Sequence, residues 1–387
     1  MSITLNKDFF GVVYTPRREE VYSNGGGVLY PRPVELHHAG EDNGLVLATF
    51  DHYTVKEPPV MPIYASRDHG RTWEFYSQVE DTAKGHGLRF QPMLLELDRD
   101  VADLPAGTLL FAANAIPLPL VSTEIMFFIS RDHGRSWEYR SSVCAGGPPA
   151  EQNFEELGAV WEPFIYINAA GDITVVYSDE RPHSDRRFNQ TLAIQVSRDG
   201  GKTWGEQRFV TAIPDGWQRP GMAVVTRLPN GKYFMCYEIV NWKDTTEPLC
   251  DIHFKLSDDG VDWGDPAEKG TRLETADGFF LGSMPYCLWV PQGGENGTIL
   301  VSGKRDSEGL RLRDPGDFLV NYHLGEGPWE RVPMLVHYDS RMTQAGWSMG
   351  MCTVEEGRKL LQLAPTQCDT RLMQISYGLA EIAEETP

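Results

Sequence analysis

The chain lacks the usual signals of a membrane, redox, metal or nucleotide site. No apolar run in its 387 residues approaches the length needed to span a bilayer. Its six cysteines are scattered without a Cys-x-x-Cys spacing, so we expect buried free thiols. The sequence also has no glycine-rich phosphate loop and no metal-ligating side chains at a telling spacing. We therefore expect no cofactor and no metal.

Basic charge is scarce as well. Lysine and arginine number 35 against 55 aspartates and glutamates, which gives a formal net charge of −20. This charge disfavours nucleic acid and anionic membranes as partners, whereas a neutral sugar would be indifferent to it. Residues 1–7 have no apolar signal-peptide core, which predicts a cytoplasmic protein, or a secreted one if a signal peptide was removed. The oligomeric state is left open.

What the chain has in abundance is glycine (38), proline (26) and a repeated turn. Ser66–Trp73 reads Ser-Arg-Asp-His-Gly-Arg-Thr-Trp. It recurs at Ser130–Trp137 and Ser197–Trp204, and in a shorter form at Ser257–Trp263. In each copy the aspartate can accept backbone N–H bonds, the glycine supplies turn geometry and the tryptophan packs against a strand. We interpret the repeat as a structural hairpin turn, whose Asp and His residues are not catalytic.

The spacing of the turns predicts the architecture. The turn tryptophans, with a degenerate fifth, lie 64, 67, 59 and 66 residues apart: Trp73, Trp137, Trp204, Trp263 and Trp329. This period is typical of four-stranded blades, so we predict an all-β, six-bladed β-propeller that occupies residues 1–387 as a single domain. The sixth blade lacks an outer strand at the C-terminus, and Phe9–Tyr14 is predicted to supply it and close the ring. The only helix expected is Ala380–Glu384.

Two carboxylates occupy positions that point to chemistry. In a propeller the ends of the inner strands converge on a central pocket. Glu162 lies between Trp161 and Pro163 at the start of a predicted inner strand, and Glu238 ends the apolar segment Tyr233–Tyr237. A carboxylate pair is the minimum requirement for glycoside hydrolysis. The alternative, that each glutamate is structural and bridged to an arginine, stays open at this point.

The turns resemble the Asp-boxes, or BNR repeats, of the sialidase clan. Over most of its length the chain further resembles the exo-acting α-L-arabinanases of that clan. The segments that carry this second resemblance include Gly87–Pro92, Trp161–Phe164, Tyr177–Arg181, Arg219–Met222 and Tyr237–Glu238. The resemblance implies a retaining, exo-acting hydrolase that releases arabinobiose from 1,5-arabinan. It also implies Glu162 and Glu238 as the catalytic pair. We favour Glu162 as acid/base and Glu238 as nucleophile, but the sequence does not settle these roles.

Further candidates for binding an oligosaccharide or polysaccharide stand near predicted strand ends. They are Arg32, Asp51, Tyr53, Arg89, Asn114, Asp179, Arg181, Arg219, Tyr237, Arg305 and Trp347. Arg181 or Arg219 would keep the nucleophile ionised. Tyr53 and Trp347 would stack against sugar rings, with packing an equally good explanation for each.

Three other functions remain as alternatives. An exo-sialidase would hold a carboxylate with Arg32, Arg219 and Arg305 and use a Tyr/Glu nucleophile, although Tyr30–Pro33 departs from the segment expected there. A non-catalytic carbohydrate-binding propeller would make both glutamates structural. An enzyme with the same glutamate pair but altered loops would cleave another furanoside or a pyranoside.

Overall fold

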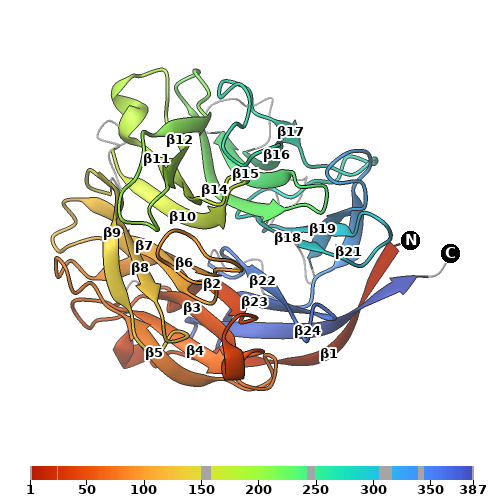
Figure 1. Ribbon diagram of the computed structural model, residues 1–387, viewed down its shortest axis with the longest axis horizontal. Coiled ribbons are helices and arrows are strands. Elements are labelled where there is room, and N and C mark those ends of the chain that lie inside the picture. Colours follow the sequence, from red (N-terminus) through yellow and green to blue (C-terminus); the bar gives the residue numbers. More distant parts are fainter. Residues whose placement is uncertain are drawn as a thin grey trace.

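The computed structural model describes residues 2–23, 25–149, 158–241, 249–304, 316–338 and 344–385. Six four-stranded antiparallel sheets stand as blades around a central axis (Figure 1). The six-bladed all-β prediction is therefore confirmed. The helices within the described ranges are single 3₁₀ turns (Arg18–Glu20, Gly40–Asp42 and Arg181–Ser184), all far too short to cross a bilayer.

Each blade runs from an inner strand, listed first, to an outer one. Blade one has β2 (Val28–Glu35), β3 (Val46–His52), β4 (Met61–Ser66) and β5 (Glu74–Val79); blade two has β6 (Leu88–Glu96), β7 (Leu109–Ala115), β8 (Thr123–Ser130) and β9 (Glu138–Gly146). Blade three has β10 (Val160–Ile167), β11 (Ile173–Asp179), β12 (Thr191–Ser197) and β13 (Arg208–Thr211); blade four has β14 (Gln218–Arg227), β15 (Tyr233–Asn241), β16 (Cys250–Ser257) and β17 (Thr271–Arg272).

Blade five has β18 (Tyr286–Val290), β19 (Thr298–Ser302), β20 (Asp317–Asn321) and β21 (Glu330–Pro333); blade six has β22 (Gly350–Val354), β23 (Lys359–Gln367), β24 (Met373–Glu385) and β1 (Ser2–Tyr14). The middle strands are packed on both faces, so most of their residues are apolar, and every residue of β7 and β8 is buried. The outer strand β5, in contrast, alternates over its last residues between partly exposed and buried positions.

The two ends of the chain close the ring in blade six. β1 pairs with β24 antiparallel, from Ser2 opposite Glu385 to Tyr14 opposite Ile375, as predicted (Figure 1). The helix expected at Ala380–Glu384 is wrong, because this segment is the end of β24. It is paired to β1 on one side and β23 on the other, and its side chains alternate between buried and exposed. Tertiary strand pairing has overridden the local helix propensity of alanine and glutamate.

The repeated turns join the third and fourth strands of their blades, on the outside of the ring. In the first copy, Asp68 Oδ1 accepts hydrogen bonds from Ser66 Oγ (2.7 Å), Arg71 N (3.1 Å) and Thr72 N (2.8 Å). Its other oxygen accepts one from Thr72 Oγ1 (2.7 Å). The aspartates of the other copies make comparable bonds. In the degenerate fifth turn the amide of Asn321 serves instead, accepting from His323 N (2.9 Å) and Gly325 N (2.8 Å). The structural interpretation of these turns is confirmed.

One residue with a positive φ recurs in every blade, on its innermost strand or just before it. These residues are Tyr30, Gln91, Glu162, Met222, Met284 and Ser348, with φ between 52° and 60°. Four of them coincide with register shifts between the first and second strands. Such bulges re-aim side chains and backbone N–H groups. Glu162 therefore occupies the position on the innermost strand at which a residue of positive φ recurs in each of the six blades.

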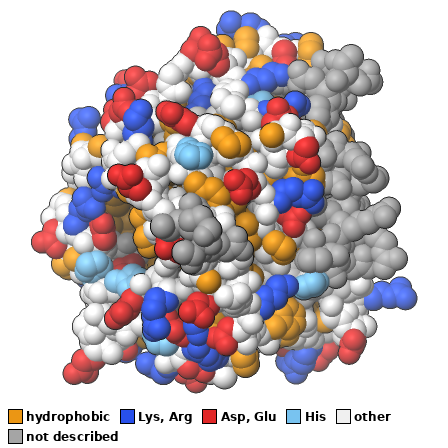
Figure 2. Space-filling model, turned by 90° about the vertical axis from the view of Figure 1, so that its right-hand side faces the viewer, with side chains coloured by type: hydrophobic (Ala, Val, Ile, Leu, Met, Phe, Trp, Pro, Cys, Tyr) orange, Lys and Arg blue, Asp and Glu red, His pale blue; other side chains and the backbone are white. Residues whose placement is uncertain are grey.

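Charge is dispersed over the molecular surface rather than collected in one field. Figure 2 shows acidic and basic side chains interspersed on the side of the molecule that faces the viewer. Many acids carry paired cations: Asp103, for example, lies within 4 Å of the charged groups of Arg131, Arg140 and Lys202. The excess negative charge thus forms no single large patch on the side shown.

Candidate active site

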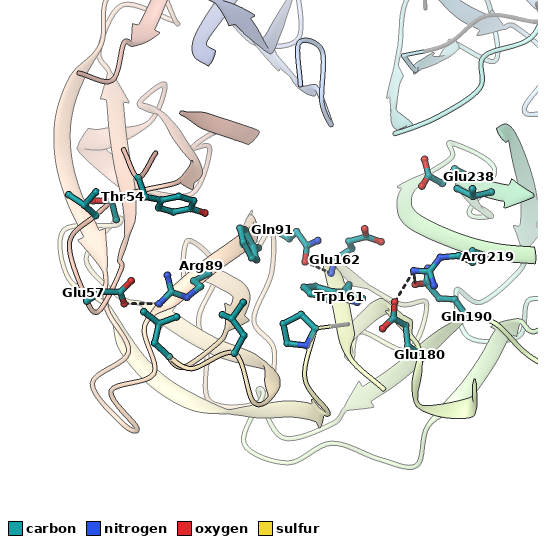
Figure 3. Close-up of a pocket in the computed structure, with 17 residues that line it drawn as sticks. Thr54, Glu57, Arg89, Gln91, Trp161, Glu162, Glu180, Gln190, Arg219 and Glu238 are labelled. Carbon is teal, nitrogen blue, oxygen red and sulfur yellow. Dashed lines mark hydrogen bonds and ion pairs between the residues drawn. The ribbon is translucent and has the colours of Figure 1, made fainter. Parts of the chain in front are cut away.

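A cavity of about 840 Å³ lies among the ends of the first and second strands of blades one to four. One end is lined by Glu162, Glu180, Gln190, Arg219 and Glu238 of blades three and four. Thr54, Glu57 and Arg89 of blades one and two lie at the other end (Figure 3). We call it the axial cavity. Tyr22, Phe90 and Trp161 add aromatic surface, and such a mixture of apolar walls and a few polar groups is typical of ligand sites.

Glu162 is held from both neighbouring blades. Its backbone N–H donates to Gln91 Oε1 of blade two at 2.9 Å. Its carboxylate Oε2 accepts from Ser178 Oγ at 2.6 Å within its own blade, and from the N–H of Met222 in blade four at 2.8 Å. The φ of +60° at Glu162 allows its N–H and its side chain to face different blades.

The environment of Glu162 favours its neutral form. Burial raises the pKa of this carboxyl group above its ordinary value, and the nearby Glu180 carboxylate adds to the effect. The hydrogen bonds from Ser178 and Met222 and the positive charge of Arg219 act in the opposite direction, because they stabilise the ionised form, but they do not cancel the rise in pKa caused by burial. A carboxyl group that keeps its proton to higher pH is suited to general-acid chemistry.

Glu238 lies beside Glu162, with Gly221 between their two strands. Gly221 of β14 pairs with Glu238 of β15, and residues paired in this way present their side chains on one face of a sheet. A Cβ atom at Gly221 would lie 3.4 Å from Glu162 Oε2 and 2.9 Å from Gln190 Nε2. The missing side chain thus leaves room for the Gln190 amide, and the Glu162 carboxylate lies just beyond contact distance of the same position. Glu238 Oε2 itself accepts the N–H of Met284 at 2.7 Å, a bond that stabilises negative charge there.

A partly buried ion pair between Arg219 and Glu180 lines the cavity beside the two glutamates. Arg219 donates to Glu180 Oε1 (2.8 Å), Gln190 Oε1 (2.6 Å) and Asn189 Oδ1 (2.8 Å) (Figure 3). Arg219 therefore neutralises Glu180, which the sequence analysis did not select although it lies inside the Tyr177–Arg181 segment. Glu180 is 3% exposed and lines the cavity. Its Oε2 is shielded from solvent and has no hydrogen-bond partner within the described ranges.

Gln91 is a second residue that sequence reasoning missed. It lines the cavity at the positive-φ position of blade two and links three predicted site residues. Its N–H donates to Asp51 Oδ1 at 2.6 Å, and its side-chain Oε1 accepts from Asn114 Nδ2 at 2.6 Å as well as from the N–H of Glu162. Burial raises the pKa of Asp51 well above its usual range. Asp51 and Asn114 thus position Gln91, and through it Glu162, and neither of them lines the cavity.

Arg89 and Tyr53 belong to the end of the cavity that lies away from the glutamates. Arg89 Nε donates to Ile116 O at 2.9 Å and its NH2 to Glu57 Oε2 at 2.6 Å. Tyr53 packs between Tyr22 and Phe90, two aromatic residues of the cavity wall, with ring centroids 5.7 and 5.4 Å away. Tyr53 supports that wall from behind.

Asp179 and Arg181 bind each other and do not line the axial cavity. Arg181 Nε donates to Asp179 Oδ1 at 2.8 Å, and its NH2 to Asp179 Oδ2 at 2.9 Å and Gln207 Oε1 at 2.6 Å. Tyr237 is fully buried and donates to Lys269 O at 2.6 Å. These three residues therefore hold strand ends together behind the cavity.

The remaining candidates lie elsewhere. Arg32 is 2% exposed, stacks 4.0 Å above the Tyr30 ring and donates to Ser348 Oγ at 2.8 Å. The Trp347 ring lies 5.7 Å from Lys304 Nζ. Arg305 is outside the described residues. Arg32 does not line the cavity and Arg219 is already bound to three acceptors, so these two arginines do not form the open carboxylate clamp that a sialidase would need.

Metal ligation has no candidate among the residues that the structure describes, which contain no group of three or more His, Cys, Asp or Glu arranged to hold an ion. The six cysteines are free thiols, and four of them are buried. The polar chemistry of the axial cavity thus rests on carboxylates, amides and a guanidinium.

A six-bladed propeller whose inner strands carry two glutamates to one end of a cavity has the layout of an enzyme that cleaves glycosidic bonds. Solved structures agree. An α-L-arabinanase of Penicillium chrysogenum, in complex with arabinobiose, is 33% identical over 98% of both chains with a TM-score of 0.82. The α-L-arabinofuranosidase of Fusarium graminearum from glycoside hydrolase family 93, also bound to arabinobiose, is 28% identical over 97% of this chain and 98% of its own, with a TM-score of 0.79.

The chain therefore belongs to the α-L-arabinanases and α-L-arabinofuranosidases of glycoside hydrolase family 93. A sialidase of Streptococcus pneumoniae shares the fold alone: it is 12% identical, with a TM-score of 0.57 over 96% of this chain and 70% of its own. A scan against protein-family models and a search of curated proteins find no match.

Proposed function

We propose that this glycoside hydrolase is a retaining, exo-acting enzyme that cleaves α-L-arabinofuranosidic linkages in 1,5-arabinan or arabino-oligosaccharides. The observation that carries the proposal is that Glu162 of β10 and Glu238 of β15 line the same end of the axial cavity, with Gly221 of β14 close to both. The family relatives in complex with arabinobiose support the choice of sugar. A cavity of about 840 Å³ suits the end of a sugar chain rather than a long segment of it, which supports exo action.

The two carboxyl groups divide the reaction into two displacements. In the first, the Glu238 carboxylate attacks the anomeric carbon while Glu162 gives its proton to the departing glycosidic oxygen. The product is a covalent glycosyl–enzyme ester and a shortened sugar chain. In the second, Glu162, now ionised, takes a proton from water. The resulting hydroxide displaces Glu238 and releases the sugar with its original anomeric configuration. Retention requires carboxyl groups only about 5–5.5 Å apart, and we expect that separation when a sugar is bound at the end of the cavity that both glutamates line.

The assignment of roles follows from the two environments. Burial holds the pKa of Glu162 above its ordinary value, so Glu162 is the group that we expect to carry a proton into the first step. Glu238 accepts the N–H of Met284, which favours the charged form that a nucleophile needs. Glu180 and Gln190 line the cavity beside the two catalytic candidates, and Trp161 supplies an aromatic face for a sugar ring.

Two variants test the proposal with two substrates. Glu162→Gln is expected to lower kcat/KM on arabinotriose by about 10²–10⁴-fold, because the leaving sugar loses its proton donor. The same variant should lose much less on a 4-nitrophenyl arabinofuranoside, whose leaving group departs without protonation. Glu238→Gln should be inactive on both substrates, because the nucleophile is needed whatever the leaving group.

Product analysis completes the test. Proton NMR during the reaction on linear 1,5-arabinan should show arabinobiose as the first product, with the α-configuration retained. Silence of the unmodified enzyme on every arabinoside would refute the substrate class. A first product of inverted configuration would refute the two-step mechanism, and the opposite leaving-group pattern in the two variants would exchange their roles.

A further inference from the structure

A second cavity adjoins the axial one on the outer side of blade one. It has a volume of about 410 Å³ and is lined by Tyr14 at the end of β1 and by residues of β3, β4 and β5. Thr54 and Val55 line both cavities. They stand at the end of the axial cavity away from Glu162 and Glu238, where Figure 3 shows Thr54, Glu57 and Arg89. We call this second space the outer cavity.

Aromatic side chains dominate its walls. Tyr14 stacks on Phe50 with ring centroids 5.6 Å apart, and Tyr64 lies 5.5 Å from each of them. Phe75 of β5 meets Tyr64 edge-on at 5.9 Å and is nevertheless 57% exposed. An exposed phenylalanine beside a tyrosine cluster leaves apolar surface in water that a ligand with flat C–H faces can cover.

Polar groups are interspersed with these rings. Glu19, Lys56 and Gln78 line the outer cavity, and Tyr14 Oη donates to Glu20 Oε2 at 2.8 Å. His52 Nε2 is shielded from solvent and has no hydrogen-bond partner within the described part of the chain. Burial lowers the pKa of His52, so its ring is neutral near pH 7. Two glutamates at the wall disfavour an anionic ligand, whereas a neutral polyhydroxylated one finds both ring faces and hydrogen-bonding groups.

We propose that the outer cavity binds the distal part of the neutral sugar chain whose end is cleaved in the axial cavity. This inference rests on the proposed function and adds to it a binding site for the rest of the polysaccharide. A chain with its terminal units at Glu162 and Glu238 can pass along the axial cavity to Thr54 and Val55, and there it meets the aromatic wall of the outer cavity. Phe75 is then a determinant of preference for long substrates.

The test compares a long and a short substrate in one variant. Phe75→Ala should raise KM for linear 1,5-arabinan by about three- to tenfold, the loss of one aromatic contact, and leave KM for arabinotriose unchanged. The matched control is Phe209→Ala: Phe209 is 41% exposed on the outer strand β13 of blade three and lines neither cavity. It should alter neither KM. Equal effects of Phe75→Ala on both substrates, or none on either, would overturn the inference.

A binding measurement separates this inference from the proposed function. In native gels that contain linear arabinan, the unmodified protein and Phe209→Ala should be retarded, and Phe75→Ala should be retarded less. Retardation that depends on Phe75, in a protein that cleaves no arabinoside, would keep the outer cavity as a sugar site and refute the proposed function. Cleavage with retardation that does not depend on Phe75 would refute the outer cavity alone.

Discussion

The hydroxyl group of Ser178 offers a direct test of the state of Glu162. Ser178 Oγ donates to Glu162 Oε2 at 2.6 Å, and this bond lowers the pKa of a carboxyl group that burial otherwise raises. In Ser178→Ala the ionised form of Glu162 loses one of its two donors and keeps the N–H of Met222 at 2.8 Å. The pKa of Glu162 should therefore rise further. Because the neutral form is the one that donates the proton, activity should persist to higher pH.

The magnitude follows from the kind of bond that is lost. A hydrogen bond to a charged group contributes about 1.5–3 kcal/mol, and the remaining donor places this one near the lower end. About 1.5 kcal/mol corresponds to a roughly tenfold change in the proton-binding equilibrium. At a fixed pH on the alkaline limb, Ser178→Ala should thus keep up to about ten times more of its plateau kcat/KM than the unmodified enzyme.

The assay is the pH profile of kcat/KM on arabinotriose, whose poor leaving group requires the proton donor. The control is Ser302→Ala, which removes another fully buried hydroxyl, on β19 and away from the cavity, and should leave the profile in place. If Glu162 were instead the nucleophile, the acidic limb would move to higher pH and the alkaline limb would stay. An unmoved profile would show that Glu162 does not control the reaction.

Two further predictions address the site geometry and the turns. Gly221→Ala should lower kcat/KM about tenfold or more with little change in stability, measured by kinetics and thermal unfolding, because its Cβ would lie 2.9 Å from Gln190 Nε2 and displace the side chain that binds Arg219. Unchanged kinetics would show that the position of Gln190 does not matter for the reaction. Asp68→Ala should lower the free energy of unfolding by about 1–3 kcal/mol, measured by denaturant titration, because it removes four hydrogen bonds from the turn. It should leave kcat unchanged, because the turn lies outside the cavity. A fall in kcat in the folded variant would contradict the purely structural role of Asp68.

The parts of the fold that could be predicted depend on short-range chemistry. Each repeated turn is stabilised by hydrogen bonds between residues at most four positions apart, such as Asp68 with Thr72, so its sequence specifies its geometry. Counting the turns gave the number of blades, and the missing outer strand of blade six identified the role of β1. The prediction failed at Ala380–Glu384, where pairing with a segment at the other end of the chain outweighs local propensity.

The membership of the cavity wall was predictable only in part: Glu162, Glu238, Arg89 and Arg219 line it, whereas most of the other selected residues lie behind it or elsewhere. The resemblance in the sequence selected Glu162 and Glu238, and the structure brings both to one end of the axial cavity. Gln91 and Glu180 were missed, because nothing local distinguishes them from ordinary polar residues at strand ends. Both belong to the site through hydrogen bonds to residues that are distant in sequence: Gln91 binds the N–H of Glu162, 71 residues away, and Glu180 binds Arg219, 39 residues away.

The sequence by itself thus determined the all-β class, the blade count, the ring closure and the pair of glutamates, because turn motifs and strand patterns are local. Only the tertiary structure decided that Arg219 neutralises Glu180 rather than Glu238, and that Gly221 leaves room for the amide of Gln190. It alone placed Glu162 between Gln91 and Met222 and so raised its pKa by burial. Burial and cross-blade contacts join segments that are distant in sequence, and no local pattern encodes which of them meet.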